Sequence, residues 1–257
     1  MADDLFSLRD RVALVTGGNR GLGRAIALGF QRAGARVAVT GRDPARNTAV
    51  GRELGDPDGV FALDVRDEEA VAATLARIVE RFGRLDILVN NAGMNHGASV
   101  LAMERTDWDA VVETNLTGLF LCAKHAAAAM VSRGDGGKII NVGSLYSLFG
   151  TPSFAAYGAA KAGVLGLTRA LAIELAVHGI QANAILPGWC ETDLTRGMPG
   201  TELGEEIRRR TPAGRWGQPD DMVGAAIFLA SAASDFVTGV HLPVDGGYTV
   251  TERFVHP

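Results

Sequence analysis

Residues 144–161, SLYSLFGTPSFAAYGAAK, hold a serine, a tyrosine and a lysine in a run otherwise poor in charge. Tyr157 and Lys161 are spaced i, i+4, so on a helix they share one face, one turn apart. A phenol titrates near pH 10, roughly, in model peptides, and a nearby positive charge lowers that pKa. The phenol can then exchange a proton with a carbonyl or an alcohol close to neutral pH. The spacing is also common by chance, so the pair alone, with Ser144 upstream, indicates only a candidate acid/base centre.

A glycine-rich stretch, TGGNRGLG at residues 16–23, follows an apolar run and precedes a helical pattern. A strand, such a turn and a helix N-terminus form a phosphate site, because free N–H groups and the helix dipole face the anion. The spacing is T-G-x-x-x-G-x-G rather than G-x-G-x-x-G, and glycines also serve close helix–strand packing. We expect a dinucleotide here, contacted by Gly17, Asn19, Arg20, Gly21, Leu22 and Gly23.

The second apolar run ends in VAVTGRDP and places Arg42 where NAD sites usually carry a carboxylate. A guanidinium there favours the 2′-phosphate of NADP(H), and Arg20 adds a second positive charge. Asp43 keeps NAD(H) open, because the general fingerprint expects an acid about 20 residues beyond the turn. Asp43 also precedes Pro44, a pattern typical of a helix N-cap. We therefore expect NADP(H) to be favoured over NAD(H).

Two further apolar runs end in residues suited to the same ligand. Asp64 and Val65 end the third run, where the carboxylate could accept from an adenine amino group or cap a helix. The fourth run ends in NNAG, so that Asn91, Ala92 and Gly93 follow it. Amides and small residues at the carboxyl end of a strand fit the ligand crevice of open α/β sheets.

The elements that must position these residues alternate along the chain. Short, continuously apolar strands separated by helices predict a parallel sheet covered on both faces, joined by right-handed crossovers. The expected fold class is α/β: a single doubly wound Rossmann-type domain over residues 1–257, with helices flanking both faces of a central parallel sheet. The expected strands are 11–18, 35–41, 59–65, 85–93, 137–144, 180–188 and 239–247, and the expected helices are 23–34, 45–54, 67–82, 106–133, 155–178 and 219–232.

Residues 189–216 interrupt this alternation with a long connection rich in glycine and proline. Long connections in compact domains are often binding lids. We predict a substrate lid at about 189–216, with an ordered helical excursion of no functional consequence as the alternative.

The bulk composition excludes several classes of function. The chain has 257 residues, 47% of them hydrophobic and 21% charged, and a net charge of −4, which provides no electrostatic footprint for nucleic acid or an anionic membrane. Its two cysteines form no Cys-x-x-Cys or Cys/His cluster, so we expect neither a disulfide framework nor a metal site. No apolar stretch reaches membrane-spanning length and the N-terminus lacks an apolar signal region, so we expect a cytoplasmic protein without a membrane partner.

Taken together, residues 10–250 resemble the short-chain dehydrogenase/reductase family. The motifs that carry the resemblance follow the family's order: Thr16-Gly17-x-x-x-Gly21-x-Gly23, Asp64, Asn90-Asn91-Ala92-Gly93, Asn115 in ETNLTG, Ser144, Tyr157-x-x-x-Lys161, Pro187-Gly188, Thr192 and a terminal VDGG. The resemblance implies an NAD(P)-dependent enzyme that interconverts a secondary alcohol and a ketone. It also implies a homotetramer.

The resemblance further implies a role for each catalytic candidate. Tyr157 would be the acid/base, and Lys161 would hold the nicotinamide ribose and lower the pKa of the phenol. Ser144 would orient the carbonyl oxygen. Asn115 would hold a water for a proton relay, with a helix-bending amide as the alternative.

The remaining matches would hold the cofactor. Asn91 would contact a ribose, while Thr192 and the backbone around Pro187 and Gly188 would fix the carboxamide.

The substrate is less defined. Candidate pocket residues lie in loops beyond the strand ends: Met94, His96, Tyr146, Phe154 and Trp189. The segments TPAGRWGQPDDM and SDFVTGVHLPVDGG resemble the sugar-acid members of the family, such as gluconate dehydrogenases, and also the 3-oxoacyl-carrier-protein reductases. An NAD-dependent sugar or sugar-acid dehydrogenase therefore stays an alternative. A non-catalytic dinucleotide sensor is a further one, against which the complete serine, tyrosine and lysine set argues.

Overall fold

A parallel sheet forms the centre of the computed structural model, which describes residues 5–251. Within that part the sheet has seven strands in the order β3-β2-β1-β4-β5-β6-β7, and every neighbouring pair is parallel. The strands are β1 (Val12–Thr16), β2 (Arg36–Gly41), β3 (Val60–Ala62), β4 (Ile87–Asn90), β5 (Gly137–Val142), β6 (Ile180–Pro187) and β7 (His241–Val244). The predicted α/β fold class is confirmed; residues 1–4 and 252–257 of the predicted domain lie outside the described residues.

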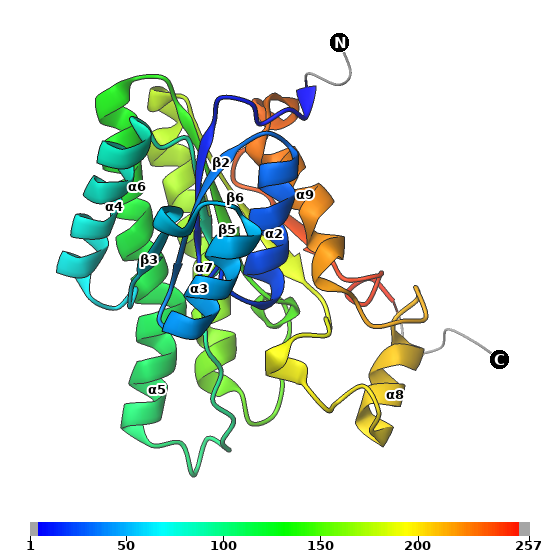
Figure 1. Cartoon of the computed structure of the whole chain (residues 1–257). Coiled ribbons are helices and arrows are strands. Elements are labelled where there is room, and N and C mark those ends of the chain that lie inside the picture. The colour runs from blue at the N-terminus through cyan, green and yellow to red at the C-terminus, as the bar shows by residue number, and fades with distance from the viewer. Residues whose placement is uncertain (1–4, 252–257) are drawn as a thin grey trace.

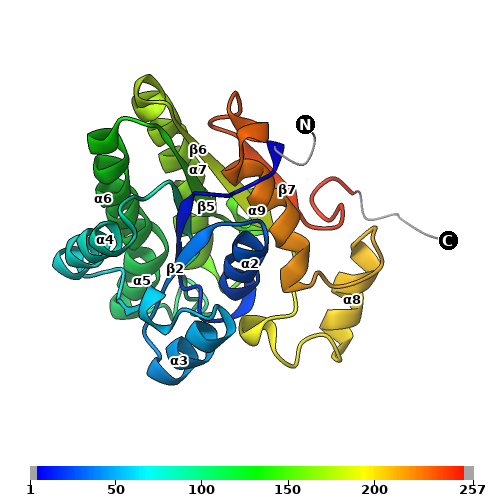
Figure 2. The same cartoon turned by 45° about the horizontal axis from the view of Figure 1, so that its top comes forward.

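Helices cover both faces of the sheet, as Figures 1 and 2 show. One face carries α2 (Gly21–Arg32), α3 (Pro44–Glu53) and α9 (Val223–Ala230). The opposite face carries α4 (Glu68–Phe82), α6 (Gly118–Arg133) and α7 (Ala155–Leu175). The helix α5 (Arg105–Val112) packs against α7 and lies at the lower end of the molecule in Figure 1. The sheet therefore separates two hydrophobic cores.

Alternation along β1 divides its side chains between these cores. Val12 and Leu14 pack with α4 and α6, whereas Ala13 and Val15 pack with α2 and α9. Successive side chains of a strand point to opposite faces, so a strand buried on both faces needs apolar residues at every position. The continuous apolar runs of the sequence are explained by this double coverage.

Two predicted elements differ in detail from the structure. The helix expected at 106–133 is interrupted by a π-helical turn, η2 (Glu113–Thr117), which separates α5 from α6. The connection at 189–216 contains the short turn η5 (Asp193–Thr195) and the helix α8 (Glu202–Arg210). The indole Nε1 of Trp216 donates to the Gly204 carbonyl at 3.1 Å, which ties α8 back to the end of this connection.

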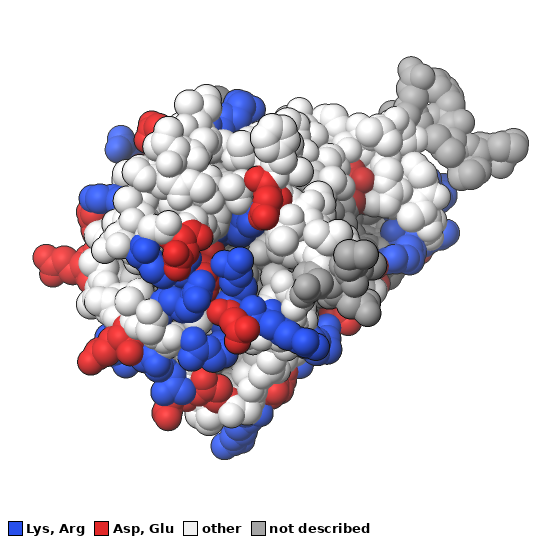
Figure 3. Space-filling view, turned by 90° about the horizontal axis from the view of Figure 1, so that it is seen from above, with Lys and Arg blue, Asp and Glu red and all other residues white. Residues whose placement is uncertain are grey.

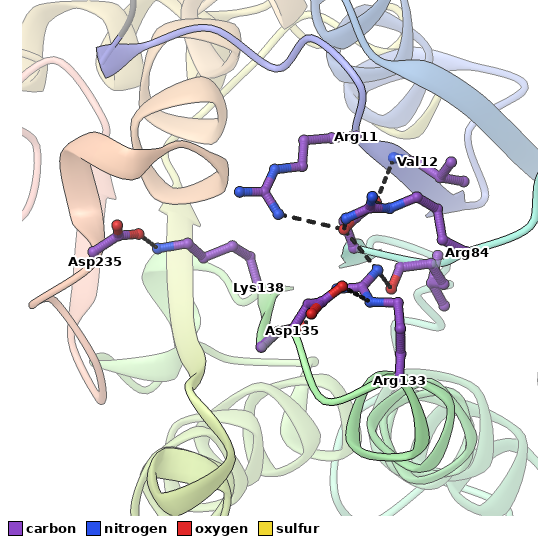
Figure 4. A network of polar contacts seen from close by, with 10 residues as sticks. Arg11, Val12, Arg84, Arg133, Asp135, Lys138 and Asp235 are labelled. Carbon is purple, nitrogen blue, oxygen red and sulfur yellow. Dashed lines mark hydrogen bonds and ion pairs between the residues drawn. The ribbon is translucent and has the colours of Figure 1, made fainter.

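The amino ends of the strands carry a network of ion pairs around Asp86, drawn in Figure 4. This carboxylate is 1% exposed and accepts from the Val12 N–H at 2.8 Å. It also accepts from Arg84 at 2.6 Å, from Arg133 at 2.7 Å and from Arg11 at 3.4 Å. Figure 3 views this edge and shows positive and negative side chains interspersed across it. Acidic and basic side chains are thus paired with one another at this edge.

The described part of the chain, residues 5–251, also bears on membrane, metal and cysteine chemistry. No helix in that part is long and apolar enough to cross a membrane. No group of three or more potential metal ligands occurs in the same part of the chain. Cys122 and Cys190 are buried free thiols, and burial raises their pKa values to about 12 and about 11.

Candidate active site

A cleft of about 390 Å³ opens at the carboxyl ends of the strands, at the lower edge of the sheet in Figure 1. It lies where the strand order reverses, between β1 and β4, which is the expected ligand crevice of a doubly wound sheet. The predicted residues that line it are Gly17, Asn19, Arg20, Gly21, Leu22, Arg42, Asp64, Val65, Asn91, Ala92, Gly93, Met94, Asn115, Ser144, Tyr157, Lys161, Pro187, Gly188 and Thr192.

The glycine turn after β1 requires residues without side chains at two positions. Gly17 has φ +62°, and a Cβ there would lie 2.9 Å from the Ala92 Cα. A Cβ on Gly23 would lie 2.6 Å from the Gly17 carbonyl oxygen and 2.3 Å from the Asn91 amide. The turn is therefore pressed against the end of β4, and its bare backbone at the start of α2 fits the pyrophosphate of a dinucleotide.

The Asn91 side chain, just after β4, stabilises the glycine turn by hydrogen bonds. Its Nδ2 donates to the Thr16 and Gly17 carbonyls, at 3.0 Å each. The Thr16 hydroxyl oxygen accepts in turn from the Asn91 and Ala92 N–H groups. Both amide hydrogens of Asn91 are thus used within the protein, which leaves Oδ1 as the side-chain group for the expected ribose contact.

Three arginines gather at the end of the cleft beyond β2. Arg42 lies 3.8 Å from Asp64, while Arg46 and Arg20 lie 2.7 and 4.0 Å from the same Asp193 oxygen. Arg46 and Asp193 line the cleft but are not among the predicted residues. A second arginine four residues after Arg42, in the first turn of α3, is the sequence signal that identifies Arg46.

The two acidic residues of this region are already engaged. Asp43 is the N-cap of α3, and its Oδ1 accepts from the Ala45 and Arg46 N–H groups. The N-cap interpretation of Asp43 is therefore correct. For Asp64 it is wrong, because Asp67 caps α4. A side-chain hydrogen bond from Arg66 is the largest influence on Asp64 and lowers the pKa of its carboxyl.

Tyr157, Lys161 and Ser144 meet on the other side of the cleft. The Lys161 Nζ lies 5.7 Å from the centroid of the Tyr157 ring and donates to the Val142 carbonyl at 2.8 Å. The Ser144 hydroxyl accepts from the Tyr146 N–H at 3.1 Å. The i, i+4 spacing on α7 thus places phenol and ammonium together beside the end of β5.

Burial is the largest influence on the pKa values of Lys161 and Tyr157. Burial lowers the pKa of Lys161 to about 8. Burial also raises the pKa of Tyr157, and a hydrogen bond with Ser144 partly opposes that effect. Among the protein's own groups, burial therefore opposes the predicted lowering of the Tyr157 pKa, and the Lys161 amine is directed to the Val142 carbonyl. A further positive charge in the cleft would favour the phenolate, in addition to the hydrogen bond with Ser144.

Asn115 lies in the π-helical turn between α5 and α6. Its Nδ2 donates to the Met94 and Val111 carbonyls, both at 2.8 Å, and its Oδ1 accepts from the Met94 N–H at 3.3 Å. The side chain thus joins the irregular helix to the loop after β4. π-turns of this kind are frequent at functional sites.

The segment after β6 closes the cleft from a third side. Gly188 packs closely, since a Cβ there would lie 2.7 Å from the Asp245 backbone. The Thr192 hydroxyl accepts from the Leu194 N–H at 3.3 Å, and the Thr192 N–H donates to Thr195 at 3.0 Å. These bonds form the turn η5, so Thr192 holds the first residues of the predicted lid against the cleft.

An aromatic cluster surrounds the catalytic candidates. Tyr146 lies at its centre, with ring centroids 6.1, 6.2 and 6.0 Å from those of Phe154, Tyr157 and Trp189. Trp216 extends the cluster, 5.6 Å from Trp189. Tyr146, Phe154 and Trp189 are thus brought together beside Tyr157, and Trp216, at the end of the predicted lid, joins them.

Within the described residues, His96 belongs to neither the cleft lining nor the aromatic cluster. Its imidazole is 43% exposed and lies 3.3 Å from the Asp107 carboxylate on α5. Of the five predicted substrate residues, Met94 lines the cleft, whereas His96, Tyr146, Phe154 and Trp189 are not among the described residues that line it. The structure therefore favours the exposed-loop interpretation of this histidine.

Comparisons with known proteins agree with this geometry. A family model described as enoyl-(acyl carrier protein) reductase matches residues 17–249. The chain is 42% identical over 254 residues to gluconate 5-dehydrogenase of Gluconobacter oxydans, covering 96% of this chain and 98% of that protein. It is 40% identical over 242 residues to the 3-oxoacyl-[acyl-carrier-protein] reductase of Vibrio cholerae, covering 94% of this chain and 98% of that protein.

A solved structure extends the comparison to three dimensions. The crystal structure of a gluconate 5-dehydrogenase from Burkholderia cenocepacia, in complex with NADP and tartrate, superposes with a TM-score of 0.93. Its sequence is 42% identical, and the match covers 98% of this chain and 100% of that one.

The fold and the cleft define a nicotinamide-dinucleotide-dependent oxidoreductase that acts on CH–OH groups, interconverting a secondary alcohol and a ketone. The chain belongs to the short-chain dehydrogenase/reductase family.

Proposed function

We propose that the chain is an NADP(H)-preferring oxidoreductase of sugar-acid-type hydroxyl groups, with Tyr157 as its acid/base. The observation that carries the proposal is the meeting of Tyr157, Ser144 and Lys161 in the same cleft as the glycine turn. Acid/base chemistry on an alcohol needs a proton acceptor within reach of the reacting oxygen, next to the cofactor.

Each polar group of the site has a distinct task. A bound nicotinamide dinucleotide supplies the acceptor or donor of hydride. Tyr157 takes the proton of the alcohol oxygen in oxidation and returns it in reduction, while Ser144 donates a hydrogen bond to the same oxygen. The Lys161 ammonium has three hydrogens and donates one to the Val142 carbonyl. The other hydrogens are available for the nicotinamide ribose. Asn115 orders the loop at Met94 and, in its π-turn, holds a water for proton relay.

The other cleft residues would hold the dinucleotide. The turn and its supports take the pyrophosphate, the ends of β3 and β4 take adenine and ribose, and the segment after β6 takes the carboxamide. The residues assigned to these tasks are Gly17, Asn19, Arg20, Gly21, Leu22, Gly23, Arg42, Asp64, Val65, Asn91, Ala92, Gly93, Pro187, Gly188 and Thr192.

The preference for NADP(H) is supported by the charges around the adenosine end. Three guanidinium groups lie at the adenosine end of the cleft, those of Arg20, Arg42 and Arg46. The Asp43 carboxylate accepts hydrogen bonds as the N-cap of α3. The Burkholderia relative was crystallised with NADP. A 2′-phosphate would replace the carboxylate partners of these arginines through charge-assisted hydrogen bonds.

Fluorescence titration with NADPH and NADH tests this preference. Arg42→Ala or Arg46→Ala should each weaken NADPH binding about tenfold and leave NADH binding within about twofold. Arg196→Ala is the matched control, because Arg196 also pairs with Asp193 but is 79% exposed and does not line the cleft. Equal losses for both cofactors, or tighter NADH binding by the wild type, would contradict the assignment.

A sugar-acid substrate is supported by the relatives rather than by any one contact. The Gluconobacter and Burkholderia proteins are named gluconate 5-dehydrogenases, whereas the Vibrio protein of similar identity is named for an acyl-carrier substrate. We also propose that residues 189–216 act as the substrate lid of a single domain. Ile207 of α8 packs with Leu145, Trp216 and Tyr248 next to the catalytic candidates. Turnover of a panel of sugar acids and 3-oxoacyl thioesters distinguishes the two substrate classes.

We further propose that the chain forms a homotetramer, as the family resemblance implies, and that it is cytoplasmic, as expected from the sequence. In the alanine-rich part of α6, Ala126 and Ala127 are buried within the subunit, whereas Ala128 is exposed. Phe120 on α6 and Ile173 on α7 are exposed by 44% and 77% and are better candidates for a subunit interface. Light scattering on the purified chain tests the oligomeric state.

The decisive experiment on the acid/base assignment is Tyr157→Phe. We expect near-normal NADPH affinity and a fall in kcat of about a thousandfold, since only the proton-exchanging hydroxyl is removed. Circular dichroism should match the wild type. A Tyr157→Phe variant with wild-type turnover would overturn the proposal.

A further inference from the structure

Ser147 occupies a position between two of the proposed catalytic residues. It follows Ser144 by one turn, in the short 3₁₀ turn η3 (Leu145–Ser147), and neither its sequence context nor its exposure singles it out. Its hydroxyl, however, makes two hydrogen bonds to residues far apart in the chain. The oxygen accepts from the Ser144 N–H at 3.2 Å, and the hydroxyl donates to the Lys161 carbonyl at 2.7 Å.

These two bonds join both sides of the catalytic group. Ser144 lies just beyond the end of β5, and Lys161 lies on α7, 14 residues after Ser147. The Lys161 ammonium is in turn bonded to Val142, two residues before Ser144. The loop and the helix are therefore connected twice, once through the lysine side chain and once through the Ser147 hydroxyl.

The connection bears directly on the orientation of the Ser144 side chain. The Ser144 N–H is held by Ser147, and the Ser144 hydroxyl oxygen accepts from the Tyr146 N–H at 3.1 Å. The Ser147 N–H donates back to the Ser144 carbonyl at 2.9 Å. With these bonds the backbone of Ser144 has little freedom, so its hydroxyl is kept in one direction beside Tyr157.

From this bonding pattern we propose that Ser147 is a positioning residue, which holds the Ser144 hydroxyl and the Lys161 backbone in the relative arrangement that proton exchange by Tyr157 requires. The proposal rests on the proposed function. Catalytic groups need their own orientation locked by a supporting layer of hydrogen bonds, and small displacements lower turnover more than ground-state binding.

Ser147→Ala removes only the hydroxyl. We expect kcat to fall about tenfold, with KM and the Kd for NADPH within about twofold, because the lost bonds position groups without holding the cofactor. Ser147→Thr keeps a hydroxyl and should recover most of the turnover. Ser99→Ala, in an exposed loop at the same edge of the sheet, is the matched control and should behave as the wild type.

The pH profile of kcat for alcohol oxidation separates positioning from mere stability. The hydrogen bond with Ser144 lowers the pKa of Tyr157, so loosening it should move the acid limb of the profile to higher pH. The other titratable groups facing Tyr157 are Lys161 on its own helix and Tyr146 on the loop, and both are kept in the variant. A purely structural role would lower the melting temperature and leave this limb in place.

The outcomes are distinguishable from failure of the proposed function. If Tyr157→Phe abolishes turnover but Ser147→Ala retains wild-type kcat and pH profile, Ser147 has no positioning role and the acid/base assignment stands. If Tyr157→Phe is fully active, the proposed function itself fails. Should Ser147→Ala not fold, Ser147→Cys keeps the size of the side chain with a weak hydrogen-bonding group, and the same fall in kcat and shift of the limb are expected.

Discussion

A buried lysine ammonium lies at each end of strand β5, and the two differ in the chemical group that accepts their hydrogen bond. Lys138, at the amino end, donates to the Asp235 carboxylate at 2.8 Å. Lys161, beside the carboxyl end, donates at the same distance to the carbonyl of Val142. Burial lowers the pKa of both lysines, but in the described residues only Lys138 has an opposing carboxylate.

The groups around the two lysines show the same difference between paired and unpaired charge. At the amino end, burial acts to raise the pKa of Asp86, but its hydrogen bond with Arg84, the Val12 N–H and the charge of Arg133 outweigh burial and keep that pKa lowered. Figure 4 shows the arginines converging there and Lys138 directed to Asp235. At the carboxyl end, the buried cation is left with a neutral partner.

The difference between a paired and an unpaired buried lysine indicates separate roles for the two edges of the sheet. Charges that serve the fold are neutralised within the fold, because an unpaired buried charge is destabilising. Burial lowers the pKa of both lysines, so the difference lies in Lys161, which has no carboxylate partner among the described residues and keeps hydrogen-bonding capacity free. Perturbed groups of this kind concentrate at functional sites. The amino edge is therefore a structural network, whereas the buried ammonium at the carboxyl edge fits the proposed cofactor site.

The same substitution at both lysines gives the largest test of this comparison. Lys161→Met should lower kcat about a thousandfold, because it removes the proposed ribose donor and the cation beside Tyr157. Lys138→Met should leave kcat within about twofold, since Asp235 is exposed to water and can be solvated when its partner is lost. Steady-state kinetics on both variants decides, and comparable losses at the two positions would remove the distinction between the edges.

The second test concerns stability at the amino edge. Asp86→Asn should lower the free energy of unfolding by about 3 kcal/mol, since it leaves the partly buried arginines without their common carboxylate. Asp235→Asn, whose carboxylate is 68% exposed, should cost less than about 1 kcal/mol. Urea denaturation measures both, and kcat should be unchanged for each. A loss of kcat in folded Asp86→Asn protein would show that the amino edge also serves the reaction.

The smallest expected effect is a pH dependence of stability. The pKa of Lys161 is lowered from 10.5 to about 8, so the unfolded state binds its proton more tightly than the folded state. The resulting penalty is fully present below pH 8 and is relieved as pH rises from about 8 to 10.5. Relative to Lys161→Met, the wild type should therefore gain about 2 kcal/mol of stability between pH 7.5 and 10. A constant difference in denaturation midpoint would mean that Lys161 is not desolvated.

Local patterns in the sequence were sufficient for the fold class and for most of the cleft. Strand and helix periodicities depend on neighbours a few residues apart, and parallel strands bring all their carboxyl ends to one edge. The glycine turn, Arg42 and the Tyr157–Lys161 pair were for this reason predictable as residues of one site. Their catalytic and binding roles stay predictions.

Contacts between distant segments were decided only by the tertiary structure. Arg46 and Asp193 are separated by 147 residues, and nothing local marks them as partners. The hydroxyl of Ser147 acquires its two partners only when α7 packs against the end of β5. His96 is drawn to Asp107 on α5 rather than to the cleft.

The pKa values of the site residues were also decided only by the tertiary structure. A list of residue types predicts which groups can titrate, but the direction of the shift depends on how much water the fold excludes. Lys161 beside Tyr157 suggested a phenol with a lowered pKa, whereas burial raises it. Residue types and spacing thus determine which chemistry is available to this chain, and packing determines the free energy of each charge, because desolvation depends on all the surrounding atoms rather than on the neighbours in sequence.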